Sequence, residues 1–227
     1  MRDRPVVAIA TRNRDKLREI LELLAGLPIV FTSFLDHPEV PEVMETGDTL
    51  RENALLKARA AARALGVPAV ADDSGLEVRA LGGAPGVLSS RFAGEAATYA
   101  DNVRRLLEMM RAVPAGEREA RFVCVAALVE PPGAGTGEGG EGRGTREGRE
   151  AVVEGEVRGL ITREPRGGRG FGYDPVFFVP ELGRTFAEAE TAEKQRTSHR
   201  ARAFARVREL LEARLREGGL SRPAGMV

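Results

Sequence analysis

The sequence predicts an α/β protein with a mixed, twisted central sheet flanked by helices. Helical and strand patterns alternate in the N-terminal half, whereas strand patterns dominate the C-terminal half. The chain has 227 residues, and at roughly 150 residues per domain it needs one core, or one core and a small lobe. A composition of 42% hydrophobic and 30% charged residues excludes wholesale disorder and a disulfide scaffold. No apolar run approaches the roughly 18 residues of a membrane-spanning helix, so we expect no membrane partner.

The N-terminal half reads as strand, helix, strand, loop and helix. Residues 5–10 form a short β-branched run, which is typical of a buried strand. A helix follows, because apolar residues recur at i, i+3, i+4 and i+7: Leu17, Ile20, Leu21 and Leu24. Residues 28–34 predict a second strand and 38–47 an acidic loop. Residues 48–65 predict a helix that Asp48 or Thr49 caps, with a stripe of small residues that lets it lie close to a sheet.

The remaining elements follow from the same patterns. An apolar run at 68–71 leads into Asp72-Asp73-Ser74-Gly75, and a strand pattern resumes over 76–81. A helix is expected over 98–112, strands over 120–130, 151–161 and 175–179, and a last helix from about 197 to 216. Eight of the twenty residues at 131–150 are glycine, so we expect a flexible inserted loop between two strands, with no chemistry of its own.

Charge and cysteine usage limit the partners and the compartment. Lys and Arg total 34 and Asp and Glu total 34, so the chain lacks the cationic field of most nucleic-acid binders and we expect no nucleic-acid partner. The single cysteine, Cys124, cannot form a disulfide within the chain, and no signal-peptide pattern begins it. These features predict a cytoplasmic protein.

The first candidate site lies where the first strand meets the first helix. A helix N-terminus offers backbone N–H groups and a positive dipole end, which suit a phosphate chain. The residues there add a hydroxyl group and cations; they are Thr11, Arg12, Asn13, Arg14, Asp15 and Lys16. The alternative is an ordinary helix start, with Asn13 as the cap, Asp15 complementing the dipole and Lys16 in solvent. The pattern leaves both interpretations open.

The second candidate site is the Asp72-Asp73 pair that follows a strand. Successive side chains of an extended segment point to opposite faces, so the two carboxylates should reach one metal only if the chain turns between them. One aspartate would then act and the other would orient. The alternative is an Asp-Ser-Gly turn without chemistry. Mg²⁺ needs only one or two protein carboxylates, so Asp73 with Glu45 from the acidic loop would suffice, with Glu42 in reserve.

Two further clusters lie near the C-terminus. In Gly170-Phe171-Gly172-Tyr173-Asp174, Phe171 could stack on a base while Asp174 accepts hydrogen bonds. Taken alone, the motif favours the alternative, a tight turn with a core phenylalanine. Further on, Ser198 is a good N-cap, which would place Lys194, His199 and Arg200 around one helix start, an arrangement that suits an anion. By itself, His199 is a weak candidate for a general base.

Taken together, these motifs resemble one enzyme family. The segments IATRNRDK, ETGDTLRENALLKA, ADDSGLEVRALGGAPGVLSSRFAG, GFGYDPVF and AEKQRTSHRARAF stand in the order and approximate spacing of the purine nucleoside triphosphate pyrophosphatases that act on inosine and xanthosine triphosphates and their deoxy forms. The resemblance spans about residues 5 to 215. Five separate motifs agree, which makes it specific.

The resemblance implies Mg²⁺-dependent hydrolysis of the α–β phosphoanhydride of ITP, dITP or XTP, which yields the monophosphate and pyrophosphate. It also implies a homodimer in which residues 1–227 form one two-lobed domain with the active-site cleft between the lobes. Carried over by motif, residues Thr11 to Lys16 and Lys194 would bind phosphate, Asp73 would be the catalytic carboxylate and, with Glu45, a metal ligand, and Ser74 would contact substrate. Phe171, Gly172, Tyr173 and Asp174 would hold base and sugar, and His199 with Arg200 would read the base.

Two departures and two rival functions remain. Met44 stands where the family often has a second glutamate, which leaves the second metal ligand open, and Gln195 stands where asparagine is common. One rival is a related pyrophosphatase that acts on modified pyrimidine nucleotides, against which Ser198-His199-Arg200 speaks. The other is a nucleotide sensor or nucleic-acid binder that uses the arginine-rich last helix, which the zero net charge disfavours.

Overall fold

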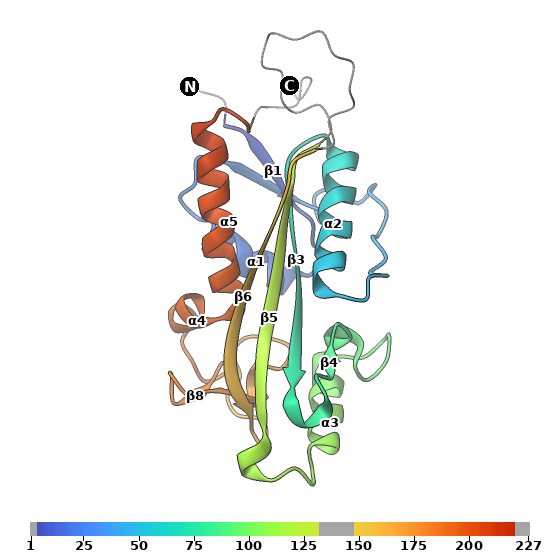
Figure 1. Ribbon diagram of the computed structural model, residues 1–227, viewed down its shortest axis with the longest axis vertical. Helices are drawn as coiled ribbons and strands as arrows, with labels where there is room; N and C mark the ends of the chain where they lie inside the picture. Colours follow the sequence, from blue (N-terminus) through green and yellow to red (C-terminus); the bar gives the residue numbers. More distant parts are fainter. Residues whose placement is uncertain (1–3, 132–147, 221–227) are drawn as a thin grey trace. The chain divides into compact units, whose positions relative to one another are not determined.

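The computed structural model describes residues 4–131 and 148–220 and has one mixed sheet with flanking helices, which confirms the predicted fold class (Figure 1). The strands are β1 (Val6–Ile9), β2 (Val30–Ser33), β3 (Ala69–Val78), β4 (Pro85–Gly86), β5 (Glu119–Val129), β6 (Glu150–Ile161), β7 (Phe177–Val179) and β8 (Arg184–Thr185). Their order is β2-β1-β3-β5-β6-β7-β8, with β4 paired to β3. β1 pairs in parallel with β2 and β3, whereas the β6–β7 and β7–β8 pairs are antiparallel.

Five α-helices accompany these strands in the described residues. They are α1 (Arg14–Leu23), α2 (Leu50–Leu65), α3 (Tyr99–Met109), α4 (Thr191–Thr197) and α5 (His199–Arg216). None of these helices is long and apolar enough to cross a membrane.

The chain divides into two compact units. Unit 1 comprises Met1–Asp73, Val125–Val153 and Phe204–Val227, and unit 2 comprises Ser74–Cys124 and Glu154–Ala203. The strands β3, β5 and β6 and the helix α5 therefore contribute residues to both units.

Unit 1 has its core between helices and the first strands. The residues of β1 and of the first half of β3 are almost entirely buried, as their unbroken apolar runs predict. In Figure 1, α2 and α5 lie on opposite sides of the strands of this unit. The predicted small-residue stripe of α2 faces inward, since Ala54, Ala58 and Ala61 are fully buried.

The ends of α2 follow local sequence signals. Thr49 accepts a hydrogen bond from the backbone N–H of Glu52, and the Glu52 side chain accepts from the backbone of Thr49, which is a capping box. Gly66 ends the helix in the left-handed conformation. Of the two predicted caps, Thr49 is therefore the residue used.

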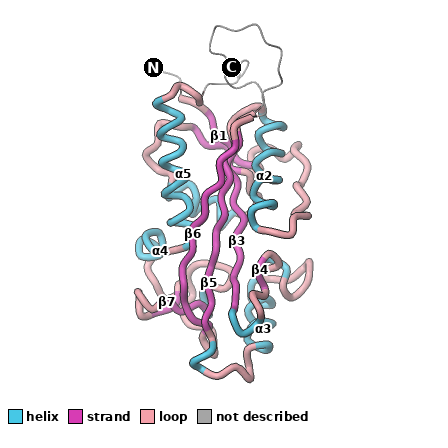
Figure 2. The backbone as a smooth tube through the Cα atoms, viewed as in Figure 1, coloured by secondary structure: helices cyan, strands magenta, loops and turns pink. Residues whose placement is uncertain are grey.

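Unit 2 has a separate core of large side chains. α3 contributes Val103, Leu106 and Met110, which pack with aromatic residues of the later strands. The rings of Phe122 and Phe177 have centroids 4.6 Å apart. Figure 2 shows α3 on one side of the strands of this unit and α4 on the other.

Several predicted boundaries are wrong. β3 runs through Asp72-Asp73-Ser74-Gly75 without a turn and ends at Val78, and residues 79–81 form a 3-10 turn rather than strand. The strand predicted over 175–179 begins only at Phe177, after a 3-10 turn. The last helix begins at His199, and the short helix α4, which the sequence did not predict, precedes it. Most of the predicted loop 131–150 lies outside the described residues, at 132–147.

Candidate active site

The two adjacent aspartates of β3 have different partners within unit 1. An Asp72 oxygen lies 3.3 Å from the ammonium nitrogen of Lys16. Asp73 lies 3.3 Å from the ammonium of Lys57 and accepts a hydrogen bond of 3.3 Å from the side-chain amide of Asn53. Since β3 is extended here, successive side chains point to opposite faces. The structure therefore gives the two carboxylates separate surroundings, as the sequence predicts for an extended segment.

Lys57 brings Glu45 and Asp73 together. Its ammonium nitrogen lies 2.5 Å from a Glu45 oxygen and 3.3 Å from an Asp73 oxygen. The Lys57 side chain is only 11% exposed and that of Asp73 only 8%, so this is a largely buried ion pair that continues to the loop carrying Glu45. Glu42, the reserve metal ligand of the sequence analysis, is exposed. We name Glu45, Asn53, Lys57, Asp72 and Asp73, together with Lys16, the carboxylate–lysine group.

The electrostatics of this group indicate an excess of negative charge. Burial lowers the pKa of Lys57, but the charges of Asp73, Glu45 and Asp72 outweigh burial and leave it raised. Burial also raises the pKa of Asp73, against the opposing effect of Lys57 and Lys16. The raised pKa of Lys57 reflects the surrounding carboxylates, whereas that of Asp73 reflects its burial. Three carboxylates surround two ammonium groups, so the group favours an added positive charge.

Asn53 is a functional candidate that the sequence analysis missed. It is fully buried, and its amide donates both to Asp73 and to the carbonyl of Gly47, while its oxygen accepts from the N–H of Gly47 at 2.8 Å. Asn53 and Lys57 stand at i and i+4 on the buried face of α2. Two polar side chains one turn apart within an alanine-rich buried face are a signal that could have identified both.

The phosphate candidates at the start of α1 are partly committed to the fold. The side chain of Asn13 accepts from the backbone N–H groups of Asp15 and Lys16, so the predicted alternative, a helix cap, describes Asn13 correctly. Thr11 accepts from the N–H of Asn13. Lys16 is not the solvated side chain of that alternative, since it pairs with Asp72.

The two arginines of this segment differ. The Arg12 guanidinium donates to the carbonyls of Phe34 and Val40 and lies over the Phe34 ring, so it holds the chain after β2 in place. Arg14 is exposed.

A second group of candidates gathers within unit 2, around Phe171. The Lys194 ammonium lies 2.5 Å from an Asp174 oxygen and 4.9 Å from the centroid of the Phe171 ring. The same Asp174 oxygen accepts from the backbone N–H of Phe171 at 2.9 Å. Gly170 has φ +73°, and a Cβ there would lie 2.0 Å from the Asp174 carboxylate. The glycines of this motif are therefore needed to close the loop over a buried carboxylate.

The start of α5 supplies a further cation, Arg200, and the histidine His199. The Arg200 guanidinium lies 5.6 Å from the centroid of Phe171 and donates to the hydroxyl of Ser74 at 3.3 Å. The His199 ring stacks on Phe122 at 4.6 Å, with an angle of 10° between the planes. A Cβ at Gly155 would lie 2.3 Å from the carbonyl oxygen of His199, so this glycine lets α5 begin against β6. Ser198 caps the helix through the N–H of Ala201, as predicted.

We name Ser74, Phe171, Asp174, Lys194, His199 and Arg200 the aromatic–cation group. Tyr173, the other residue of the motif, is 4% exposed, and its hydroxyl donates to the carbonyl of Ser89 at 2.9 Å. Burial raises the pKa of Tyr173, which keeps the phenol protonated in the core. Gly172 has φ +62° and nothing within 4 Å of an added Cβ.

The three lysines of the chain, Lys16, Lys57 and Lys194, each pair with a carboxylate of these two groups. Asp73 and Ser74 are consecutive residues, one from each group. Among the described residues no three His, Cys, Asp or Glu side chains gather as a metal cluster. A metal at Glu45 and Asp73 would thus have two protein carboxylates and would need other oxygen ligands, which is how Mg²⁺ binds together with substrate phosphates.

Comparison with known proteins gives consistent matches over most of the chain. The sequence model of the Ham1 family matches residues 7–210. A dITP/XTP pyrophosphatase of Geobacillus kaustophilus is 47% identical over 206 residues, which cover 91% of this chain and 94% of that protein. One from Escherichia coli O157:H7 is 46% identical over 214 residues, or 93% and 98% of the two chains. A solved structure of a HAM1 protein from Coxiella burnetii has a TM-score of 0.78 at 42% identity, covering 92% of this chain and 99% of that one.

Proposed function

The chain belongs to the Ham1 family and is a nucleoside triphosphate pyrophosphatase, and we propose that it hydrolyses ITP, dITP and XTP to the monophosphate and pyrophosphate with Mg²⁺. The relatives that match it over nine-tenths of its length carry the name dITP/XTP pyrophosphatase. Such an enzyme removes these nucleotides from the pool.

One observation carries the proposal: the Lys57 ammonium holds both Glu45 and Asp73. These two carboxylates are separated by 28 positions of the sequence, yet they converge on one cationic atom. Residues that converge on an ammonium group in this way can also converge on a metal cation. The raised pKa of Lys57 supports the same conclusion, because it reflects an excess of negative charge around this position, and such a group gains from an added cation.

Glu45 and Asp73 would hold the Mg²⁺ ion. When bound, the ion supplies positive charge that offsets the repulsion between the substrate phosphates and the carboxylates and polarises the phosphoanhydride. Without it, each close pair of like charges would cost about 1 to 4 kcal/mol at water-like to surface-like dielectric.

The other members of the carboxylate–lysine group have roles that follow from their contacts. Asp73 would orient or deprotonate the attacking water, with Asn53 and Lys57 fixing the direction of its two oxygens. Lys16, held by Asp72, would take up negative charge on the leaving pyrophosphate, together with Thr11 and Arg14 from the same segment. Asp72 would then act as the orienting carboxylate of the pair.

The aromatic–cation group would recognise the nucleoside. Phe171 would stack on the purine, and Lys194 would bind phosphate. N–H donors from His199 and Arg200 would pair with the 6-oxo group of hypoxanthine or xanthine. Adenine presents an amino donor at that position, so these donors would be unpaired with ATP, and sites of this kind discriminate by roughly 10⁴ to 10⁵.

The test is a pyrophosphate-release assay over ITP, dITP, XTP, ATP, GTP and dUTP, with and without Mg²⁺. We expect turnover of the inosine and xanthosine nucleotides only, and only with the metal. Equal specificity constants for ITP and ATP would refute the donor argument, and faster turnover of dUTP would favour the pyrimidine alternative.

A variant addresses the catalytic carboxylate. Asp73→Asn keeps the size of the side chain and removes its charge, so kcat for ITP should fall by at least about a hundredfold. Near-normal turnover of this variant would contradict the role of Asp73. The homodimer implied by the family resemblance and the cytoplasmic location stay predictions.

A further inference from the structure

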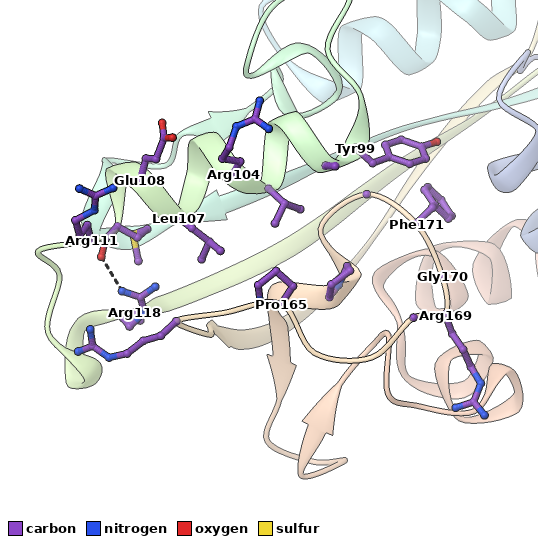
Figure 3. Close-up of a pocket in the computed structure, with 17 residues that line it drawn as sticks. Tyr99, Arg104, Leu107, Glu108, Arg111, Arg118, Pro165, Arg169, Gly170 and Phe171 are labelled. Carbon is purple, nitrogen blue, oxygen red and sulfur yellow. Dashed lines mark hydrogen bonds between the residues drawn. The ribbon is translucent and has the colours of Figure 1, made fainter.

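A cavity of about 760 Å³ lies within unit 2, apart from the carboxylates and lysines of the proposed reaction. α3 forms one wall and the segment around Pro165 and Gly168–Gly172 forms the other (Figure 3). Its volume falls in the range of about 300 to 1,000 Å³ that is typical of small-molecule sites. Val103 and Leu107 give it an apolar middle.

One end of the cavity is strongly cationic. Five arginines line the cavity as a whole, and two of them have carboxylate partners: Arg104 pairs with Asp101, and Arg169, at the Phe171 end, pairs with Glu190. For the other three, Arg111, Arg118 and Arg163, no carboxylate of the described residues lies within ion-pair distance. Figure 3 shows Arg111 and Arg118 close together at this end. The one acidic lining residue, Glu108, is exposed.

Arg118 fixes this charge inside the protein. It is 4% exposed, and its guanidinium donates to the carbonyls of Met110, Val113, Ile161 and Thr162. Carbonyl oxygens satisfy its N–H groups without cancelling the positive charge. Burial lowers the pKa of Arg118, and the positive charge of Arg163 lowers it further, as expected for neighbouring cations. An anion bound at this end would therefore reduce the electrostatic repulsion between Arg118 and Arg163.

The other end of the cavity is aromatic. The rings of Tyr99 and Phe171 lie 5.7 Å apart at 40° to each other, and Figure 3 shows both at the end opposite Arg111 and Arg118. Tyr99 is 40% exposed, so part of its surface is open to a ligand. Gly168 and Gly170 also line the cavity, and their lack of side chains lets a ligand approach the backbone there.

We propose that this cavity is a second ligand site, for a nucleoside phosphate whose phosphate contacts Arg111 and Arg163 beside the buried charge of Arg118 and whose base packs against Tyr99 and Phe171. Two or more guanidinium groups match the geometry and the double negative charge of a phosphate ligand better than they match a ligand with a single carboxylate. The site differs from the substrate site of the proposed function, because none of the three lysines and none of Glu45, Asp72, Asp73 and Asp174 lines it. It shares Phe171 and Gly172 with the residues expected to hold the substrate base and sugar, so its ligand would contact part of the surface that the substrate also uses.

The probe is adenosine 5′-diphosphate, titrated into the full-length protein by isothermal calorimetry. The test variant is Arg111→Ala/Arg163→Ala, since both side chains are exposed and their loss leaves the buried contacts of Arg118 intact. The control is Arg105→Ala, an exposed arginine of α3 that does not line the cavity. We expect ADP to bind the unmodified protein and the control alike, and the double variant to bind at least about tenfold more weakly.

A further variant, Lys16→Ala, separates this site from the substrate site, because Lys16 pairs with Asp72 in unit 1 and does not line the cavity. ADP affinity should be unchanged in it. Affinity that falls in Lys16→Ala and not in the arginine double variant would place ADP in the substrate site and overturn the proposal. A second result would also overturn the proposal: sedimentation showing that the double variant no longer self-associates, while its ADP affinity is unchanged. The cavity would then be a contact between copies of the chain. Absence of measurable ADP binding to the unmodified protein would overturn the proposal as well.

Discussion

Replacing Lys57 by methionine tests whether one ammonium group holds the carboxylates together. Methionine keeps the length of the side chain and its apolar packing but removes the charge. In the folded protein Lys57 lies 2.5 Å from Glu45 and 3.3 Å from Asp73, with 11% of its side chain exposed. The variant therefore leaves two close carboxylates without their shared counter-charge, and it leaves Asp73 nearly buried.

The magnitude follows from burial. Removing one partner of a buried ion pair costs about 3 to 5 kcal/mol. Glu45 has 27% of its side chain exposed, so water screens part of its charge, and Asp73 keeps the hydrogen bond from Asn53. Both factors place the expected loss near the lower end, at about 3 kcal/mol of unfolding free energy. A metal that binds only the folded state would restore about 2.7 kcal/mol at one hundred times its dissociation constant.

The assay is urea unfolding of the protein and of Lys57→Met, in EDTA and in MgCl₂. The variant should lose about 3 kcal/mol in EDTA and regain a large part of it with magnesium, whereas the unmodified protein, in which Lys57 competes with the metal, should gain less. The matched control is Arg59→Met on the same helix. Arg59 pairs with Glu150 at 2.6 Å, but 49% of its side chain is exposed, so its loss should cost about 0 to 1 kcal/mol and should not depend on magnesium.

A Lys57→Met protein that is no less stable in EDTA than the Arg59→Met control would refute this account of the carboxylate–lysine group. Loss of stability without any response to magnesium would support the role of Lys57 in the ion pair but would contradict the metal site at Glu45 and Asp73.

Three further predictions follow from other contacts. Asn53→Ala leaves the N–H of Gly47 without its side-chain acceptor and removes a donor to Asp73. Urea unfolding should show a free energy of unfolding that is lower by about 2 to 4 kcal/mol, and a decrease below about 0.5 kcal/mol would contradict this prediction. Phe204→Ala empties a fully buried position and should cost about 3 to 5 kcal/mol by the same measurement, where a value under about 1.5 would show that the site refolds around the gap. Hydrogen bonds from Thr98 and the nearby Arg104 lower the pKa of Asp101 to about 2; the ionised carboxylate stabilises the folded state above about pH 4, and this contribution disappears as the pH falls toward 2. Asp101→Asn should therefore flatten the dependence of stability on pH between about 4 and 2, and parallel curves for the two proteins would disprove this.

Local signals in the sequence were sufficient for most elements. Periodicity identified β1, α1, α2 and α3 and the long strands β5 and β6, and residue type identified Ser198 as a cap. Such features depend on residues within one or two turns of each other, so a single sequence contains them. The errors occurred where long-range pairing overrides local preference. The Asp-Ser-Gly segment would favour a turn by itself, but it is strand because β3 is paired along its length.

What the sequence alone determined about this protein is the set of chemical groups: five motifs, their order, and the residue types that can bind phosphate, carry a charge or stack on a base. The tertiary structure decided which groups meet. Lys57 contacts Glu45 and Asp73, which are 12 and 16 residues away, and Asn53 contacts Asp73 across 20 residues. The tertiary structure also showed that Asn13 caps α1 and that Arg12 holds the loop after β2. The reason is physical: a side chain's partner depends on how helices pack against the sheet, and no periodicity records which carboxylate lies beside which buried ammonium group.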